Sequence, residues 1–164
     1  MFRTGIGYDS HRFAEGRRLV LGGVEIPYAY GLQGHSDADV LIHALCDALL
    51  GSVADGDIGQ HFSDQDPQWK NADSTVLLAR VVERLARAGW HVVNTDATVV
   101  AEAPKLAPHI PAMRLRLAEV MGIDPSRISV KAKTNEGMDA VGRREGISAM
   151  AVATVTQQPF ANLS

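Results

Sequence analysis

The stretch 147–156 constrains the fold more than any other part of the sequence, because small or apolar side chains occupy both of its alternating positions. One set comprises Ile147, Ala149, Ala151, Ala153 and Val155, and the other includes Met150 and Val152. Alternation with a period of two predicts a β-strand, and an antiparallel sheet with one face in water would carry polar residues on that face. We therefore expect a strand that is buried on both faces, with the second face packed against another subunit.

Elsewhere the spacing of apolar residues changes between the strand and the helix period. Ser36 can cap the first helix, with Asp39 three residues on, and Gly22-Gly23 indicates a turn or bulge within a strand. Strand spacing covers residues 2–9, 19–26, 90–101, 128–134 and 147–156, and helical spacing covers 36–51, 73–89 and a segment that ends near Gly122. This order favours an α+β fold, a mixed β-sheet with helices packed on one side. We expect a single domain over residues 1–164.

Composition and charge narrow the possible partners. The chain has a formal net charge of −3 and one cysteine, Cys46. Scattered Lys and Arg residues form no basic stripe for nucleic acid or an anionic membrane surface. A single cysteine allows no intrachain disulfide and fits a reducing compartment, and the sequence has neither a signal-peptide pattern nor a long apolar span. We expect a cytoplasmic protein with no nucleic-acid or membrane partner.

Three side chains could together hold a metal ion. Asp9 and His11 lie two residues apart in a predicted strand and point to the same face, and His43 in the first helix would add a second imidazole. An Asp/His/His set leaves one position of a tetrahedral ion open, as in catalytic zinc sites. Asp47, one helical turn beyond His43, could orient that imidazole. The alternative is a chance D-x-H triplet beside an ordinary helix histidine.

Two further segments carry groups that a phosphate or a polyol would need. His35 and Ser36 precede the first helix, whose free N–H groups favour a phosphate, although Ser36 could be only a helix cap. The aperiodic loop 56–72 carries Phe62 and several carboxylates that could accept hydrogen bonds from hydroxyl groups, or that are simply solvated. The acids in and beside this loop are Asp55, Asp57, Asp64 and Asp66.

A third segment, before the last strand, combines cations, hydroxyl groups and one acid. Its polar residues are Lys131, Lys133, Thr134, Glu136, Arg143 and Arg144. Phosphate oxygens need N–H and O–H donors, and Glu136 could bind Mg²⁺ beside substrate phosphates; a soluble mixed-charge turn is the alternative. The chain lacks the Walker A, H-E-x-x-H, G-x-S-x-G and dinucleotide-binding motifs, which disfavours the common NTPase, protease, esterase and dehydrogenase classes.

Five segments, in order, resemble the successive motifs of the 2-C-methyl-D-erythritol 2,4-cyclodiphosphate synthases: GYDSH, GHSDADVLIHALCDALLG, GDIGQHFSDQDPQWKNADS, AEAPKLAPHIPAM and VKAKTNEGMDAVGRREGI. The resemblance implies a homotrimer of α+β subunits with active sites at subunit interfaces. It also implies a lyase of non-mevalonate isoprene biosynthesis, the MEP pathway. That enzyme converts 4-diphosphocytidyl-2-C-methyl-D-erythritol 2-phosphate to the cyclic diphosphate and CMP.

Residue roles follow from the same resemblance. Asp9, His11 and His43 look like zinc ligands, Glu136 like the contact to a second cation, Mg²⁺ or Mn²⁺, and His35 and Thr134 like stabilisers of the transition state. The remaining substrate contacts would come from Ser10 and Ser36, from Asp57, Ile58, Gly59, Phe62, Ser63, Asp64, Gln65 and Asp66 around the methylerythritol, from Ala101, Glu102, Ala103, Pro104, Lys105, Leu106 and Ala107 around the cytidine, and from Lys133, Asn135, Ala140 and Arg143.

Two residues depart from the usual pattern of that family. Ala140 stands where an aromatic residue is common, and Arg144 stands where glycine is common. An isoprenoid diphosphate cavity on the trimer axis would be lined by Tyr8, Arg143 and Glu145. Two other functions use the same residues: a zinc-dependent phosphohydrolase acting on a nucleotide-linked substrate, and a trimeric module that binds cytidine nucleotides around a structural metal.

Overall fold

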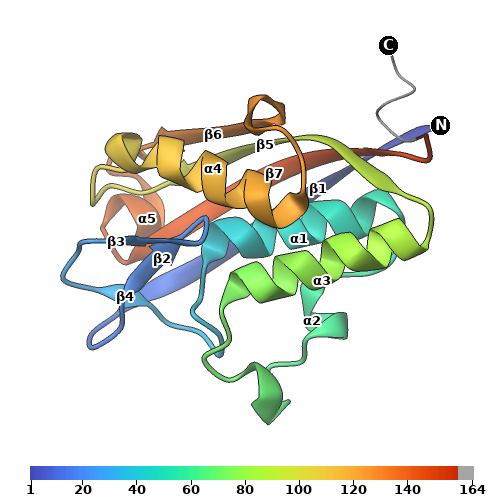
Figure 1. The fold of residues 1–164 in the computed structure, drawn as a ribbon. Coiled ribbons are helices and arrows are strands. Elements are labelled where there is room, and N and C mark those ends of the chain that lie inside the picture. Colours follow the sequence, from blue (N-terminus) through green and yellow to red (C-terminus); the bar gives the residue numbers. More distant parts are fainter. Residues whose placement is uncertain (159–164) are drawn as a thin grey trace.

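A computed structural model describes residues 1–158 of the protein (Figure 1). Its strands are β1 (Phe2–Ala14), β2 (Leu19–Leu21), β3 (Val24–Ile26), β4 (Gly31–Leu32), β5 (His91–Val100), β6 (Ile128–Lys133) and β7 (Gly146–Thr156). Its helices are α1 (Val40–Ser52), α2 (Ile58–His61), α3 (Ser74–Arg87), α4 (Ile110–Met121) and α5 (Asp139–Gly142), with 3-10 turns at Pro67–Trp69, Ala107–His109 and Pro125–Arg127. The expected strands and helices are therefore present.

Within residues 1–158, five strands form the main sheet in the order β4-β1-β7-β5-β6. Strands β5 and β6 are parallel, whereas β7 is antiparallel to both β1 and β5. The expectation of a mixed sheet is confirmed, and β7 lies at its centre. A separate hairpin pairs β2 with β3, because Gly22 and Gly23 turn the chain with φ values of 59° and 72°.

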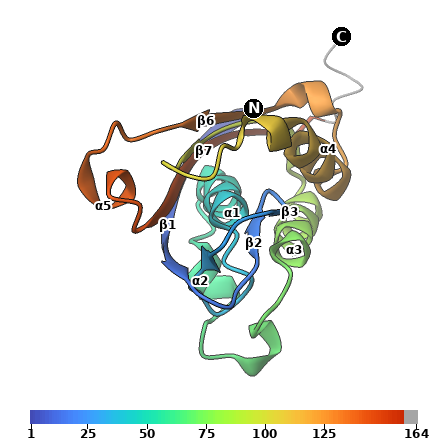
Figure 2. The same ribbon diagram turned by 90° about the vertical axis from the view of Figure 1, so that its left-hand side faces the viewer.

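Helices α1, α3 and α4 all lie on one side of the main sheet, as expected (Figure 2). Helix α1 is apolar except for His43 and Asp47 on one face, and the positions with helical spacing are all buried: Val40, Leu41, Ala44, Leu45, Ala48 and Leu49. A helix of this kind belongs in a protein interior. No helix among the described residues is long and apolar enough to cross a membrane.

The N-terminal cap of α1 differs from the expectation. The helix begins at Val40 and is capped by Asp39, whose carboxylate accepts the Ile42 N–H at 3.0 Å. Ala38 has a φ of 58°, in the left-handed region, so Ser36 lies outside the helical path. The Ser36 hydroxyl instead accepts the Ala38 N–H at 3.2 Å. The prediction of Ser36 as the N-cap is therefore wrong.

The two faces of β7 have different surroundings. Its odd-numbered residues from Ile147 to Val155 are buried beneath the helices. On the other face Met150 is 47% exposed, and Ile6 of the neighbouring β1 is 72% exposed. We call this second surface the open sheet face; it comprises Ile6, Tyr8, Met150 and Val152. One buried face is confirmed; the other is exposed among residues 1–158, and its packing against another subunit stays a prediction.

The loop 56–72 contains more structure than its sequence suggests. Helix α2 follows Asp57, whose carboxylate accepts the Gln60 N–H at 2.9 Å. The turn Pro67–Trp69 follows Asp66, which accepts the Gln68 N–H at 3.0 Å. Such caps satisfy the free N–H groups at the start of a helical turn. Two of the acids that the sequence offers for hydroxyl recognition therefore also hold the loop in shape.

Candidate functional site

Two glycines allow β1 to lie directly on α1. A Cβ atom built on Gly7 would stand 1.9 Å from the carbonyl oxygen of Ala44, and one on Gly5 would stand 2.1 Å from that of Ala48. Only glycine fits such an approach, because both distances are far below contact range. Asp9 lies on the same strand face as these glycines. The close packing therefore brings the end of β1 against the first turn of α1.

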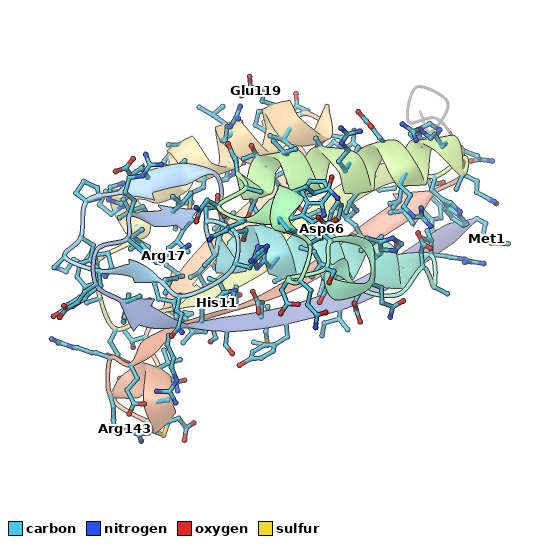
Figure 3. The ribbon with its side chains drawn as sticks, turned by 90° about the horizontal axis from the view of Figure 1, so that it is seen from below. Met1, His11, Arg17, Asp66, Glu119 and Arg143 are labelled. Atoms are coloured by element: carbon cyan, nitrogen blue, oxygen red, sulfur yellow. The ribbon has the colours of Figure 1, made fainter. Side chains whose placement is uncertain are left out.

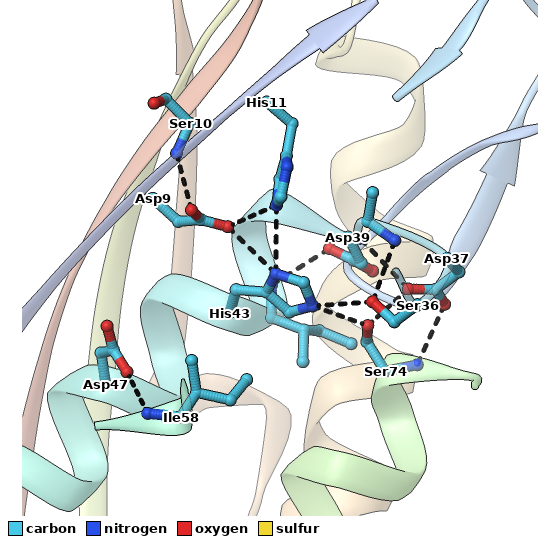
Figure 4. A network of polar contacts seen from close by, with 12 residues as sticks. Asp9, Ser10, His11, Ser36, Asp37, Asp39, His43, Asp47, Ile58 and Ser74 are labelled. Carbon is cyan, nitrogen blue, oxygen red and sulfur yellow. Dashed lines mark hydrogen bonds and ion pairs between the residues drawn. The ribbon is translucent and has the colours of Figure 1, made fainter. Parts of the chain in front are cut away.

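The expected metal ligands converge at this point (Figure 4). Asp9 Oδ2 lies 2.8 Å from His11 Nε2 and 3.0 Å from His43 Nδ1. The two ring nitrogens are 3.2 Å apart. Ligand atoms at about 2.0–2.1 Å from a tetrahedral zinc ion would be separated by about 3.3 Å. These three residues, which we call the metal cluster, therefore present one oxygen and two nitrogens at nearly the spacing that such an ion needs.

The charges of the metal cluster also suit a cation. Burial opposes ionisation of Asp9, but hydrogen bonds with His11 and His43 outweigh it and hold the pKa of this carboxyl far below its usual range. Burial disfavours protonation of His43, but Asp9 raises the pKa of His43 overall. An ionised carboxylate is therefore present at neutral pH, and carboxylate and imidazole groups are typical zinc ligands. The side chain of Asp9 remains 26% exposed, which leaves an open side for a ligand.

The second nitrogen of His43 faces two serine hydroxyls that the sequence did not assign to it. His43 Nε2 lies 3.2 Å from Ser36 Oγ and 3.1 Å from Ser74 Oγ. The carboxylate of Asp47 points elsewhere and accepts the Ile58 N–H at 2.8 Å. The prediction that Asp47 orients His43 is therefore wrong, because the start of α2 supplies a free N–H closer to that carboxylate. Ser74 lies 31 residues from His43, so no local motif could have revealed the contact.

The loop 56–72 reaches the metal cluster through His35. The ring nitrogen Nε2 of His35 lies 3.0 Å from the carbonyl oxygen of Asp66. The Asn71 N–H donates to the His35 carbonyl at 2.8 Å. Since Ser36 follows His35 and contacts His43, the expected transition-state residue lies between the loop and the metal cluster.

Phe62, expected at the substrate, packs within the loop. Its ring meets the Trp69 ring edge to face, with centroids 5.1 Å apart. Both rings line a cavity of about 810 Å³ between the loop and α3, which also includes Arg84. Asp9, His11 and His43 do not line this cavity. The cavity therefore does not mark the position of the metal cluster.

The segments expected around cytidine and phosphate meet at the carboxyl ends of β5 and β6. The Ala101 N–H donates to the Lys133 carbonyl at 2.9 Å. One carboxylate oxygen of Glu102 accepts the Asn135 N–H at 2.8 Å and the Gly137 N–H at 3.2 Å. The expected cytidine segment, residues 101–107, and the expected phosphate segment, residues 133–136, therefore form one unit, which we call the strand-end unit.

Thr134 and Glu136 belong to this unit. The Thr134 hydroxyl donates to Glu136 Oε1 at 3.0 Å, and both residues are exposed. Figure 3 shows Arg143 on a turn that projects from the body of the molecule, well away from His11 and Asp66. Within one chain, the projecting turn with Arg143 therefore lies apart from the metal cluster (Figure 3).

The two departures from the family pattern lie on the projecting turn. Arg144 has a φ of 61°, in the left-handed region that favours glycine. That conformation explains why glycine is common at this position. Ala140 is exposed on α5, and Arg143 Nε donates to Glu145 at 2.7 Å.

Comparisons with known proteins agree with this geometry. The YgbB family profile matches residues 2–156. The 2-C-methyl-D-erythritol 2,4-cyclodiphosphate synthase of Syntrophomonas wolfei is 60% identical over 155 residues, covering 94% of this chain and 99% of that protein. Its counterpart in Burkholderia thailandensis is 55% identical over 160 residues, covering 98% of this chain and 99% of that protein.

Solved structures extend the comparison to the fold. The bifunctional IspDF from Campylobacter jejuni matches with a TM-score of 0.94 and 38% identity, covering 99% of this chain but only 44% of the bifunctional chain. A 2C-methyl-D-erythritol-2,4-cyclodiphosphate synthase with bound CDP matches with a TM-score of 0.86 and 38% identity, covering 94% of this chain and 100% of the other. The chain therefore belongs to the YgbB family.

Proposed function

We propose that this protein is a cyclising lyase of isoprenoid precursor biosynthesis. It converts 4-diphosphocytidyl-2-C-methyl-D-erythritol 2-phosphate to 2-C-methyl-D-erythritol 2,4-cyclodiphosphate and CMP. The observation that carries this proposal is the convergence of Asp9, His11 and His43 in a chain that is 60% identical to a synthase of this name. A related solved synthase that binds CDP supports a cytidine nucleotide as substrate.

The reaction needs no activated side-chain nucleophile. A phosphate monoester has a second pKa of about 6 and is largely dianionic at neutral pH. An oxygen of the 2-phosphate attacks the β-phosphorus, and the bond from that phosphorus to the oxygen bridging to CMP breaks, so CMP leaves with the bridging oxygen. The task of the enzyme is to fold the substrate, align the attacking and leaving oxygens and offset the repulsion between anions.

Different residues of this chain would bind different parts of the substrate. His35 and Thr134 would donate hydrogen bonds to phosphate oxygens as charge develops. The loop residues Asp57–Gly59 and Phe62–Asp66 would bind the methylerythritol part. The strand-end unit would bind cytidine through backbone groups of residues 101–107, and Lys133 and Arg143 would meet phosphate charge.

Asp9, His11 and His43 would hold a divalent cation, and zinc best matches one carboxylate with two imidazoles. Glu136 would contact a second cation, Mg²⁺ or Mn²⁺. When bound, such cations neutralise phosphate charge.

A homotrimer would bring the projecting turn of one copy to the metal cluster of another. The metal cluster and the projecting turn with Arg143 lie apart in one chain (Figure 3), which supports a complete site built from two copies. The open sheet face supplies an apolar contact surface, since Ile6 is 72% and Tyr8 60% exposed. A closed ring of three copies would cover this face and form three equivalent sites. We assign the protein to the cytoplasm, in accord with its single buried cysteine, Cys46, and treat residues 1–164 as one synthase domain.

Phosphorus NMR of the purified protein with the cytidyl substrate, zinc and magnesium tests the proposed reaction. We expect two mutually coupled diphosphate signals together with CMP, and we expect both products to be absent after addition of a chelator. Release of inorganic phosphate would indicate a phosphohydrolase instead. Unchanged substrate, with binding of CDP detected by calorimetry, would indicate a binding module without catalysis.

A further inference from the structure

The imidazole of His43 has two nitrogen atoms, and only one of them faces the metal cluster. Nδ1 lies 3.0 Å from Asp9 Oδ2, whereas Nε2 lies 3.1 Å from the hydroxyl oxygen of Ser74 (Figure 4). A neutral imidazole carries a proton on one nitrogen and a lone pair on the other. If Nδ1 is to offer its lone pair to a cation, the proton must lie on Nε2, and Nε2 must donate it to an acceptor.

Ser74 can be this acceptor, because it donates its own hydroxyl proton to a different residue. The Ser74 hydroxyl donates to Asp37 Oδ1 in a short hydrogen bond. The Ser74 N–H donates to the other oxygen of Asp37 at 3.0 Å, which fixes the carboxylate in place. The Ser74 oxygen can therefore present only lone pairs to His43 Nε2. Ser74 is fully buried, so water does not compete for these contacts.

Ser36 is the other hydroxyl within reach of His43 Nε2, at 3.2 Å. Its oxygen already accepts the Ala38 N–H at 3.2 Å. The contact with Ser74 differs from the contact with Ser36 because the Ser74 hydroxyl in turn donates to a carboxylate. A hydroxyl that donates to a carboxylate is a stronger hydrogen-bond acceptor. Metal-bound histidines are commonly held in this way by a carboxylate on the side away from the ion.

We propose that Ser74 and Asp37 are positioning residues for His43. Asp37 fixes the Ser74 hydroxyl, and this hydroxyl holds His43 with its proton on Nε2 and leaves Nδ1 as the ligand atom. The inference rests on the metal site of the proposed function and adds to it a determinant of metal affinity. Partners of this kind change metal affinity by about 10- to 100-fold.

The same contacts connect the loop 56–72 to the metal cluster. The Asp37 N–H donates to the Ala72 carbonyl at 3.0 Å, and Ser74 is the first residue of α3, separated from the loop only by the cap residue Asp73. The residue that orients His43 therefore also lies close to the end of the loop.

Zinc affinity, measured by competition with a chelating dye, tests the proposal in the full-length protein. We expect Ser74→Ala and Asp37→Asn each to lower the affinity by about 10- to 100-fold. Asp37→Asn should add little in the Ser74→Ala background, because Asp37 acts through Ser74. Ser52→Ala is the matched control: it removes another buried serine hydroxyl, which donates to Leu49 at the far end of α1 at 2.6 Å, and should leave the affinity unchanged.

Nitrogen NMR of the zinc-loaded protein supplies a second measurement, which is compared with the exchange of the backbone amides of α1, because a general loss of stability would speed the exchange of both. The Nε2–H of His43 should exchange slowly with water in the wild type and faster in both variants. Unchanged zinc affinity in Ser74→Ala would overturn the proposal, as would a loss confined to Ser36→Ala. If Ser74→Ala does not fold, Asp37→Asn decides by the same criteria, because it keeps the Ser74 hydroxyl. A wild-type protein without zinc affinity would instead contradict the metal site itself.

Discussion

Gly7 of β1 lies so close to Ala44 of α1 that a methyl group on Gly7 would stand 1.9 Å from the Ala44 carbonyl oxygen. This contact sets the distance between β1 and α1, and hence between Asp9 and His43. Backbone atoms cannot yield to a new methyl group as a flexible side chain can.

Gly7→Ala should therefore lower the free energy of unfolding by about 3 kcal/mol or more, at or above the upper end of overpacking costs. It should also weaken zinc binding, since β1 and α1 must move apart. Urea unfolding and the zinc competition assay check the two effects. Gly51→Ala is the control, because its added Cβ would meet only one atom, the Ile6 oxygen at 3.9 Å, and alanine favours a helix by up to about 1 kcal/mol. Equal stability of the Gly7→Ala and wild-type proteins would contradict the role of this contact.

The carboxylate of Asp39 joins the β2–β3 turn to the start of α1. It accepts the N–H groups of Gly22 at 3.0 Å, Gly23 at 2.7 Å and Ile42 at 3.0 Å, and it is fully buried. Asp39→Ala would leave three donors without a partner, so we expect a loss of about 3 kcal/mol or more in the free energy of unfolding. Asp73→Ala, which removes the exposed cap of α3, should cost only about 1 kcal/mol. Chemical denaturation compares the two variants, and similar losses would show that Asp39 is only a helix cap.

Several features of the site could be predicted from the sequence because they depend on local spacing. Asp9 and His11 share a strand face through a period of two, and the helix that carries His43 is evident from its apolar positions. The cap of α1 could not be placed in this way. Ser36 fits a capping pattern, but the left-handed conformation of Ala38 has no sequence signal, since alanine rarely adopts it.

The remaining features depend on tertiary packing. The contact between Ser74 and His43 arises only once α3 lies beside α1. The strand order also had no local signal, because β7 lies between β1 and β5 although it is the last strand. The separation of the metal cluster from the projecting turn follows from that order.

Asp55 should make the stability of the protein depend on pH in a defined window. Its hydrogen bonds with Arg84, one of them 3.0 Å long, hold the pKa of Asp55 below its usual range. A lowered carboxyl pKa stabilises the folded state above the unfolded pKa of about 3.9, and this contribution disappears as the pH falls through the folded-state value. Arg84→Met should therefore be less stable than the wild type at pH 7, with a difference that shrinks below about pH 4. The effect should be small and sensitive to salt, because the pair is exposed.

Urea unfolding at a series of pH values measures this difference. Arg80→Met is the control, since Arg80 approaches Glu83 only at 3.9 Å on the same helix. A difference between Arg84→Met and the wild type that persists unchanged at low pH would assign the effect to packing of the arginine side chain instead.

The open sheet face should determine the assembly. Met150 is 47% exposed at its centre, opposite Tyr8 on β1. Met150→Lys would bury a charge in the proposed trimer contact, so we expect light scattering to show monomers and turnover to be lost. Leu115→Lys places the same charge on α4, where Leu115 is 61% exposed on the helical side, and should leave assembly and turnover intact. A trimer that survives Met150→Lys would show that the copies meet on another surface.

Mixing two inactive variants tests whether each site is shared between copies. His43→Ala removes a ligand of the metal cluster, and Glu136→Ala alters the loop beyond β6, so each variant alone should have little turnover. If a site combines the metal cluster of one copy with the Glu136 loop of its neighbour, every mixed trimer contains one site in which both residues are intact. Three quarters of randomly assembled trimers are mixed, and one of their three sites is complete, so turnover should recover to about one quarter of the wild-type value. If the two residues act within one chain, no mixed trimer has a complete site, and refolding the variants together would recover nothing.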